Sequence, residues 1–249
     1  MADDTAIGHG ISSEYRQAPV KDGPSQGWST QRVPHMFPED RTGGRTVGTE
    51  DHWERVYAKS TPNRVSWFQR RPERSLSLVA ACAPTPMTRI LDVGGGTSTL
   101  VDELLAAGFN KIGVLDISET ALGLARERLG ADAGRVEWFT TDVGSFVSPH
   151  PWDIWHDRAV FHFLGAVADR AAYRRTLQQA LAPGGHAVIS TFGPEGPTRC
   201  SGLDVVRYSP EELLTEFGPA FSLVESQDEI HRTPSGTDQQ FVYCRFRRS

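Results

Sequence analysis

Asp92 begins a short acidic and glycine-rich segment, "DVGGGTS", between an apolar run and a helical pattern. Gly94 and Gly96 allow the backbone to approach a ligand closely, because glycine has no Cβ atom, and Gly95 lies between them. A helix is expected to begin near Ser98, and the N-terminus of a helix favours a bound anion such as a carboxylate. Residue types in this order are typical of a site that holds a nucleotide-like ligand.

Two classes of ligand use a strand, a glycine loop and a helix in succession. The dinucleotide version requires the pattern G-x-G-x-x-G, and here Thr99 occupies the third glycine position. Asp92 would face the phosphates of a dinucleotide, whereas it suits a ligand that presents an ammonium group. S-adenosylmethionine has an amino group, a carboxylate, a sulfonium, a ribose and an adenine, and it has no phosphate. The loop therefore favours S-adenosylmethionine over NAD.

Two further acids close the next two expected strands. Asp116 can accept hydrogen bonds from both ribose hydroxyls, as an acid at this position does in NAD enzymes, with Ile117 beside it. Asp142 can accept from the adenine amino group, while the amide of Val143 meets a ring nitrogen. The alternative for both acids is helix capping or turn formation.

The apolar pattern predicts alternating strands and helices. Strands are expected at 89–93, 111–118, 135–142, 152–157 and 186–192, and helices at 97–108, 118–130 and 169–181. This alternation predicts a parallel sheet with helices on both faces. Ser209 and Glu212 form a capping-box pattern for another helix. The runs 221–226 and 239–248 then predict an antiparallel hairpin at the sheet edge.

The segments "LDVGGGTS", "LDIS" and "HWERVYAKS…VSWF" together resemble class I S-adenosylmethionine-dependent methyltransferases, near the branch of elongation-factor and citrate-synthase lysine methyltransferases. The family's first motif is acid-x-Gly-x-Gly-x-Gly, and Ser98 replaces its last glycine here. The resemblance implies an α/β fold: a doubly wound, mostly parallel seven-stranded sheet with an antiparallel C-terminal strand, in three α/β/α layers. Residues 1–47 are rich in Gly, Pro, Ser, Thr and charged residues without a sustained period, which predicts a flexible arm, with Met36 as an alternative start. Residues 48–249 are then the expected methyltransferase domain.

The composition of the chain excludes several other classes of protein. The chain has 249 residues and a net charge of −5, which argues against a general nucleic-acid binder. We found no apolar run of about 18–20 residues and no signal-peptide pattern, so we expect a cytoplasmic protein with no membrane partner. Cys82, Cys200 and Cys244 are too scattered for a disulfide framework or a structural zinc site, and we expect no metal.

The acceptor side is expected around the fourth and fifth strands. His156 or Asp157 is a candidate base, and Tyr208 a third candidate catalytic residue; alternatively His156 is a strand-end histidine satisfied by backbone. His162 is expected to pack. Arg199 and Arg207 either steer an anionic acceptor or are solvated, and Cys200 is either a reactive thiol or an inert buried one.

Aromatic residues upstream of the sheet complete the expected site. The family likeness implies that Trp53, Tyr57 and Trp67 form a lid over the cofactor, whereas helical spacing alone favours a core role for Trp53 and Tyr57. His156 is expected to contact the cofactor as well.

The sequence thus predicts a methyltransferase that acts by in-line displacement on a small molecule or a protein side chain. The sequence lacks an Asn/Asp-Pro-Pro-Tyr motif after the fourth strand, which disfavours adenine and glutamine acceptors. It also lacks the Pro-Cys pair of cytosine methyltransferases and the double-acid loop of arginine methyltransferases, which disfavours those two acceptors. A protein-lysine methyltransferase and a catalytically silent binding module remain alternatives. An NAD(P)-dependent oxidoreductase is disfavoured by Asp92 and Thr99.

Overall fold

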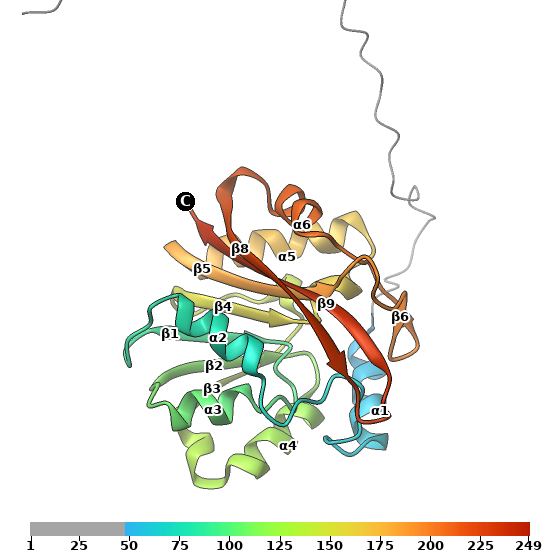
Figure 1. Ribbon diagram of the computed structural model, residues 1–249. Coiled ribbons are helices and arrows are strands. Elements are labelled where there is room, and N and C mark those ends of the chain that lie inside the picture. Colours follow the sequence, from blue (N-terminus) through green and yellow to red (C-terminus); the bar gives the residue numbers. More distant parts are fainter. Residues whose placement is uncertain (1–47) are drawn as a thin grey trace, which may run out of the picture. The chain divides into compact units, whose positions relative to one another are not determined.

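The computed structural model describes residues 48–249. The predicted arm, residues 1–47, and Met36 lie outside the described residues. A seven-stranded sheet forms the centre of the described part, in the order β3-β2-β1-β4-β5-β9-β8 (Figure 1). Its strands are β1 (Arg89–Val93), β2 (Lys111–Asp116), β3 (Val136–Thr140), β4 (Trp152–Arg158), β5 (Leu181–Phe192), β8 (Phe221–Arg232) and β9 (Asp238–Arg248).

The strand directions follow the prediction. Strands β1 to β5 pair in parallel, while β9 pairs antiparallel with β5 and β8 pairs antiparallel with β9. This confirms the doubly wound, mostly parallel sheet with an antiparallel C-terminal strand. A small hairpin of β6 (Arg199–Cys200) and β7 (Leu203–Asp204) lies outside this sheet.

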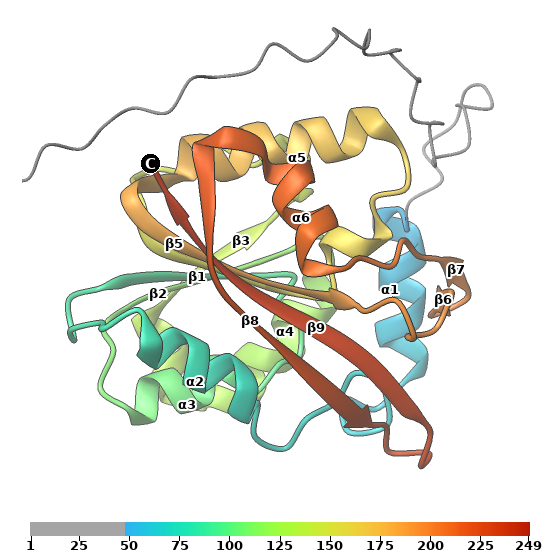
Figure 2. The same ribbon diagram turned by 45° about the horizontal axis from the view of Figure 1, so that its top comes forward.

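Helices cover both faces of the sheet (Figure 2). The α-helices are α1 (Glu50–Lys59), α2 (Glu73–Ala81), α3 (Leu100–Ala106), α4 (Glu119–Leu129), α5 (Val167–Ala180) and α6 (Pro210–Phe217). Apolar residues of α2, α3 and α4 pack with Ile90, Ile112 and Ile154 on one face. Those of α5 and α6 pack with Leu91 and Trp155 on the other. No helix among residues 48–249 combines the length and apolar character that a bilayer span requires.

The local start and stop signals agree with the predicted helices. The Ser118 side chain accepts a hydrogen bond from the Ala121 amide at the start of α4, and Ser209 and Glu212 form the predicted capping box of α6. The main differences are at strand ends. Strand β5 begins at Leu181 rather than at 186, because Leu181 pairs with Trp152 across an irregularity in the register.

Side chains along β4 alternate between the two faces, as in any strand. His156 lies on the α2 face, where its ring contacts Ser75. Asp157 lies on the α5 face, where it accepts from Tyr173. Arg158 returns to the face of His156 at the carboxyl end of the strand. This alternation decides which residues of the segment "HDR", residues 156–158, can share a site.

Candidate active site

The carboxyl ends of the parallel strands open into a large cavity. It is an open cleft with about 890 Å³ of space between atoms, part of which is open to solvent. Asp116, Ile117, Asp142 and Val143 line its part beyond β2 and β3. A neighbouring cavity lies along the glycine loop and is lined by Asp92, among others. Both cavities share Trp67, Val93, Gly94 and Arg158, so they form adjoining parts of one site.

The glycine loop turns tightly over β1 and β2. The amides of Gly94 and Gly95 donate to the Leu115 carbonyl at 2.7 and 3.2 Å. Gly94 has φ +63°, a left-handed conformation that favours glycine, and a Cβ atom there would lie 2.0 Å from Val160 Cγ2. At Gly96 a Cβ atom would lie 2.6 Å from the Tyr57 hydroxyl. The loop therefore presents bare backbone to the cavities.

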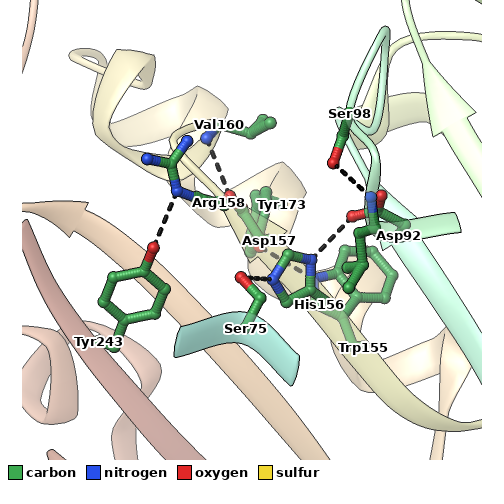
Figure 3. Close-up of polar contacts among 11 residues, drawn as sticks. Ser75, Asp92, Ser98, Trp155, His156, Asp157, Arg158, Val160, Tyr173 and Tyr243 are labelled. Carbon is green, nitrogen blue, oxygen red and sulfur yellow. Dashed lines mark hydrogen bonds and ion pairs between the residues drawn. The ribbon is translucent and has the colours of Figure 1, made fainter. Parts of the chain in front are cut away.

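Asp92 and His156 form a buried pair beside this loop. They are direct neighbours in the β1–β4 register, and Asp92 Oδ1 lies 2.7 Å from His156 Nδ1. His156 Nε2 lies 2.9 Å from the Ser75 hydroxyl, so the imidazole is held from both sides (Figure 3). Asp92 Oδ2 is buried and has no hydrogen-bond partner among the described residues. A buried carboxylate oxygen without a donor is costly, and an ammonium group of a ligand would satisfy it.

Asp116 and Asp142 face the cavity from their turns. Asp116 accepts from the Ser118 amide at 2.8 Å and Asp142 from the Gly144 amide at 2.9 Å. Burial raises the pKa of the Asp116 carboxyl to about 7, opposed by backbone hydrogen bonds from Ser118 and others and assisted by the charge of Asp92. The two acids therefore serve their turns and also line the cavity, so the two sequence interpretations are compatible.

The three predicted lid aromatics cover this site. Trp53 and Tyr57 from α1 and Trp67 from the following loop line the large cavity, with ring centroids 6.1–6.4 Å apart. Trp53 also lies edge-on to Phe163, at 5.0 Å between ring centroids. The α1 helix is fixed to α4, because the Glu54 carboxylate accepts from the Thr120 amide at 3.2 Å and from its hydroxyl.

The structure places Asp157 and Tyr208 outside the residues that line the two cavities. The carboxylate of Asp157 accepts from the Tyr173 hydroxyl at 2.5 Å and from the amides of Val160 and Phe161 at 2.8 and 3.2 Å. Burial raises the pKa of Asp157 to about 6, opposed by these hydrogen bonds. Tyr208 packs in the core below β4 and α5. Both residues thus lie on the face of the sheet away from His156.

Other residues singled out in the sequence have defined surroundings. Arg199 pairs with Asp204 at 3.2 Å, and Arg207 donates to the carbonyls of Pro194 and Gly196. Cys200 is buried in the wall of the large cavity, and burial raises the pKa of its thiol. His162 is buried, and its Nδ1 accepts from the Phe192 amide at 3.2 Å, which accords with packing.

Three further residues complete the site. Ser75 enters from α2, and Gln239 enters from β9 into the large cavity. Arg158 belongs to the "HDR" run, but its side chain spans both cavities. The parity of β4 places it with His156, a signal that was available in the sequence; the approach of Ser75 and Gln239 depends on tertiary packing.

The thirteen predicted cofactor contacts gather around the two cavities. Twelve of them line one or both: Trp53, Tyr57, Trp67, Asp92, Gly94, Gly95, Ser98, Asp116, Ile117, Asp142, Val143 and His156. The thirteenth, Gly96, lies between Tyr57 and Asp116.

Comparisons with known proteins agree with this geometry. Residues 91–187 match the family model described as "Methyltransferase domain". The chain is similar to ubiquinone biosynthesis O-methyltransferase of Aromatoleum aromaticum, with 31% identity over 53% of this chain and 50% of that protein. It is also similar to EEF1A lysine methyltransferase 2 of Homo sapiens, with 26% identity over 75% of this chain and 80% of that protein.

A third relative is much longer than this chain. The similarity to the polyketide synthase component of compactin nonaketide synthase from Penicillium citrinum is 28% identity over 61% of this chain and 5% of the synthase. The chain thus spans half or less of the length of two of these three relatives.

Two solved structures share the fold. An S-adenosylmethionine-dependent methyltransferase from Anabaena variabilis superposes with a TM-score of 0.63 at 16% identity, over 85% of this chain and all of that one. N-methyltransferase NodS from Bradyrhizobium japonicum, in complex with S-adenosyl-L-homocysteine, gives a TM-score of 0.60 at 21% identity, over 81% of this chain and 98% of that one.

The fold is that of a class I, Rossmann-like methyltransferase, as the order of the strands in the sheet and the similar solved structures show. The glycine loop and the acids near the strand ends lie at one edge of this sheet. The match to the methyltransferase-domain model, residues 91–187, runs from β1 into β5.

Proposed function

We propose that this protein is an S-adenosylmethionine-dependent methyltransferase whose acceptor is a small molecule or a protein side chain. One observation carries the proposal. Asp92, with a buried unpartnered oxygen, lies at the same edge of the sheet as Asp116 and Asp142, beside a glycine loop that leaves backbone exposed to the cavity. This donor and acceptor set fits an amino group, a ribose diol and an adenine, in that order along the sheet.

Each residue has a binding task in this proposal. Asp92 Oδ2 accepts from the amino group of the cofactor, and the His156–Ser75 contact fixes the orientation of the Asp92 carboxylate. Asp116 accepts from the ribose hydroxyls, and the turn at Asp142 receives the adenine. Hydroxyls held by a buried carboxylate contribute about 1–3 kcal/mol. The aromatic residues of α1 exclude water from the reactive end.

When bound, S-adenosylmethionine would supply an electrophilic methyl group on its sulfonium for in-line transfer to the acceptor, with the thioether as the leaving group. The protein's part is alignment and desolvation, which are worth several kcal/mol in such reactions. His156 is already engaged at both ring nitrogens, and Asp157 faces away from the cavities. Of the predicted catalytic residues, we therefore assign His156 a positioning role and give Asp157 and Tyr208 no direct step.

Calorimetric titration with S-adenosylmethionine, S-adenosylhomocysteine and NAD tests this proposal. We expect micromolar binding of the first two and no binding of NAD. Tight NAD binding without S-adenosylmethionine binding would falsify it. A second step measures release of S-adenosylhomocysteine with metabolite pools and with proteome extracts. Cofactor binding with no turnover on any pool would identify a catalytically silent binding module.

A further inference from the structure

Arg158 lies where the two cavities meet, and its guanidinium is held on three sides. Nε donates to the Tyr243 hydroxyl at 2.8 Å (Figure 3), and Nη1 donates to the Trp67 carbonyl at 2.9 Å. The guanidinium carbon also lies 4.7 Å from the centre of the Phe241 ring. These contacts fix the plane of the guanidinium, so its remaining nitrogen points in one direction.

That remaining nitrogen has no partner. Arg158 Nη2 is buried and makes no hydrogen bond with any residue in 48–249. No ion pair within that range includes Arg158; the nearest carboxylate in its network, Glu229, is reached only through the Tyr243 hydroxyl, which donates to Glu229 at 2.9 Å. A buried guanidinium nitrogen without an acceptor is costly. Its geometry suits a carboxylate, which accepts charge-assisted hydrogen bonds from arginine.

The sheet order separates this cation from the cavity acids. Asp116 and Asp142 follow β2 and β3, on one side of β1, whereas Arg158 ends β4 on the other side. The walls near Arg158 come from Phe192 at the end of β5, Phe241 on β9, and Trp67. Beside a cofactor in the β1–β3 half, the remaining space is therefore mainly aromatic and apolar, and Arg158 is the only cation among the described residues that line the cavity.

We propose that the methyl acceptor is a small molecule that carries a carboxylate on an aromatic or apolar body, with the carboxylate bound by Arg158. This rests on the proposed function, because the cofactor must occupy the half with Asp116 and Asp142. A lysine ammonium would meet the Arg158 guanidinium without a free carboxylate beside it, which disfavours a protein-lysine acceptor. Arg158, rather than Arg199 or Arg207, thereby recognises an anionic acceptor.

The test uses matched probes on the full chain saturated with S-adenosylhomocysteine. A panel of aromatic monocarboxylates, such as phenylacetate and indole-3-acetate, is titrated beside the corresponding primary amides. We expect carboxylates to bind at least about tenfold more tightly than their amides, because the amide forms only a neutral hydrogen bond. If no carboxylate binds, or if the amides bind equally well, the proposal is overturned by the unmodified protein alone.

Two variants assign the preference to one residue. Arg158→Gln should lose the carboxylate preference and keep its affinity for S-adenosylhomocysteine within about twofold. Arg199→Gln removes a nearby exposed arginine and should retain the preference. If Arg158→Gln instead weakens S-adenosylhomocysteine binding as much as carboxylate binding, Arg158 holds the cofactor's own carboxylate and the inference is wrong. Failure of the unmodified protein to bind S-adenosylhomocysteine would instead count against the proposed function.

Discussion

The Asp116 carboxyl is buried beside Asp92, and its raised pKa of about 7 makes it a group that titrates near neutral pH. Ribose hydroxyls donate hydrogen bonds and so prefer its ionised form. Ligand binding should therefore strengthen as pH rises through about 7, since the protonated carboxyl must first lose its proton.

We expect the affinity for 5′-methylthioadenosine to rise about tenfold between pH 6 and pH 8, from the proton linkage of one group with this pKa. This ligand contains the ribose and adenine but has no amino acid that would titrate in the same range. Calorimetry at the two pH values measures the change. Asp116→Asn should bind more weakly and with little pH dependence; a variant with the full pH dependence would show that another group is responsible.

Gly94 combines a left-handed backbone with close crowding by Val160. Gly94→Ala should weaken S-adenosylhomocysteine binding by at least about tenfold, or 1.4 kcal/mol, because the new methyl displaces the loop or Val160. Gly108→Ala is the matched control, since its φ is +88° but nothing lies within 4 Å of the added atom. It should cost about 1 kcal/mol of stability and leave affinity unchanged. Equal loss of affinity in both variants would point to general backbone strain rather than to a specific role of the glycine loop in binding.

At the scale of secondary structure, helix α1 brings its aromatic residues over the cavity through its contact with α4. Glu54 makes that contact, because its carboxylate accepts from Thr120, while Asp51 on the same helix is exposed. Glu54→Ala should release α1 at a cost of about 1 kcal/mol. The expected results are faster hydrogen exchange of the α1 amides and several-fold weaker S-adenosylhomocysteine binding.

Asp51→Ala should leave both measurements unchanged, because it removes an acid from α1 without touching α4. Unchanged exchange in Glu54→Ala would mean that the aromatic contacts of Trp53 and Tyr57 alone hold the helix. In that case α1 behaves as core rather than as a cover that responds to the cofactor.

The elements of this fold could be predicted from sequence where a local signal exists. The Ser118 cap, the Ser209–Glu212 capping box, Asp116 at the end of β2 and Asp142 just past β3 are all local signals. The start of β5 was missed because the "APGG" run resembles a stop, whereas pairing of Leu181 with Trp152 extends the strand. The partners of His156 and Arg158 lie 81 and 85 positions away, at Ser75 and Tyr243, so only tertiary packing brings them together.

For the molecule as a whole, buried ionisable groups make opposite contributions to stability as pH changes. His162 is fully buried, and burial lowers its pKa to about 3, with a smaller effect of the Arg158 charge. The unfolded chain binds a proton at this histidine below about pH 6.5, whereas the folded chain does so only near pH 3. The stability that the neutral, buried His162 contributes to the folded state is therefore lost as pH falls below about 6.5. Asp116 and Asp157 have raised pKa values, so their contributions grow as pH falls from 7 and 6.

We expect the His162 contribution to fall by about 2 kcal/mol between pH 7 and pH 5, from the linkage between its folded and unfolded pKa values. His162→Asn removes this titration, and its side-chain oxygen can accept from the Phe192 amide in place of Nδ1. The variant will be less stable at pH 7 because it leaves a cavity, but it should lose about 2 kcal/mol less than the parent protein on acidification. Urea unfolding of both proteins at the two pH values measures this difference, and comparison within each protein cancels the packing cost. Parallel losses in the two proteins would mean that His162 accepts a proton in the folded state, in conflict with an Nδ1 that already accepts a hydrogen bond from the Phe192 amide.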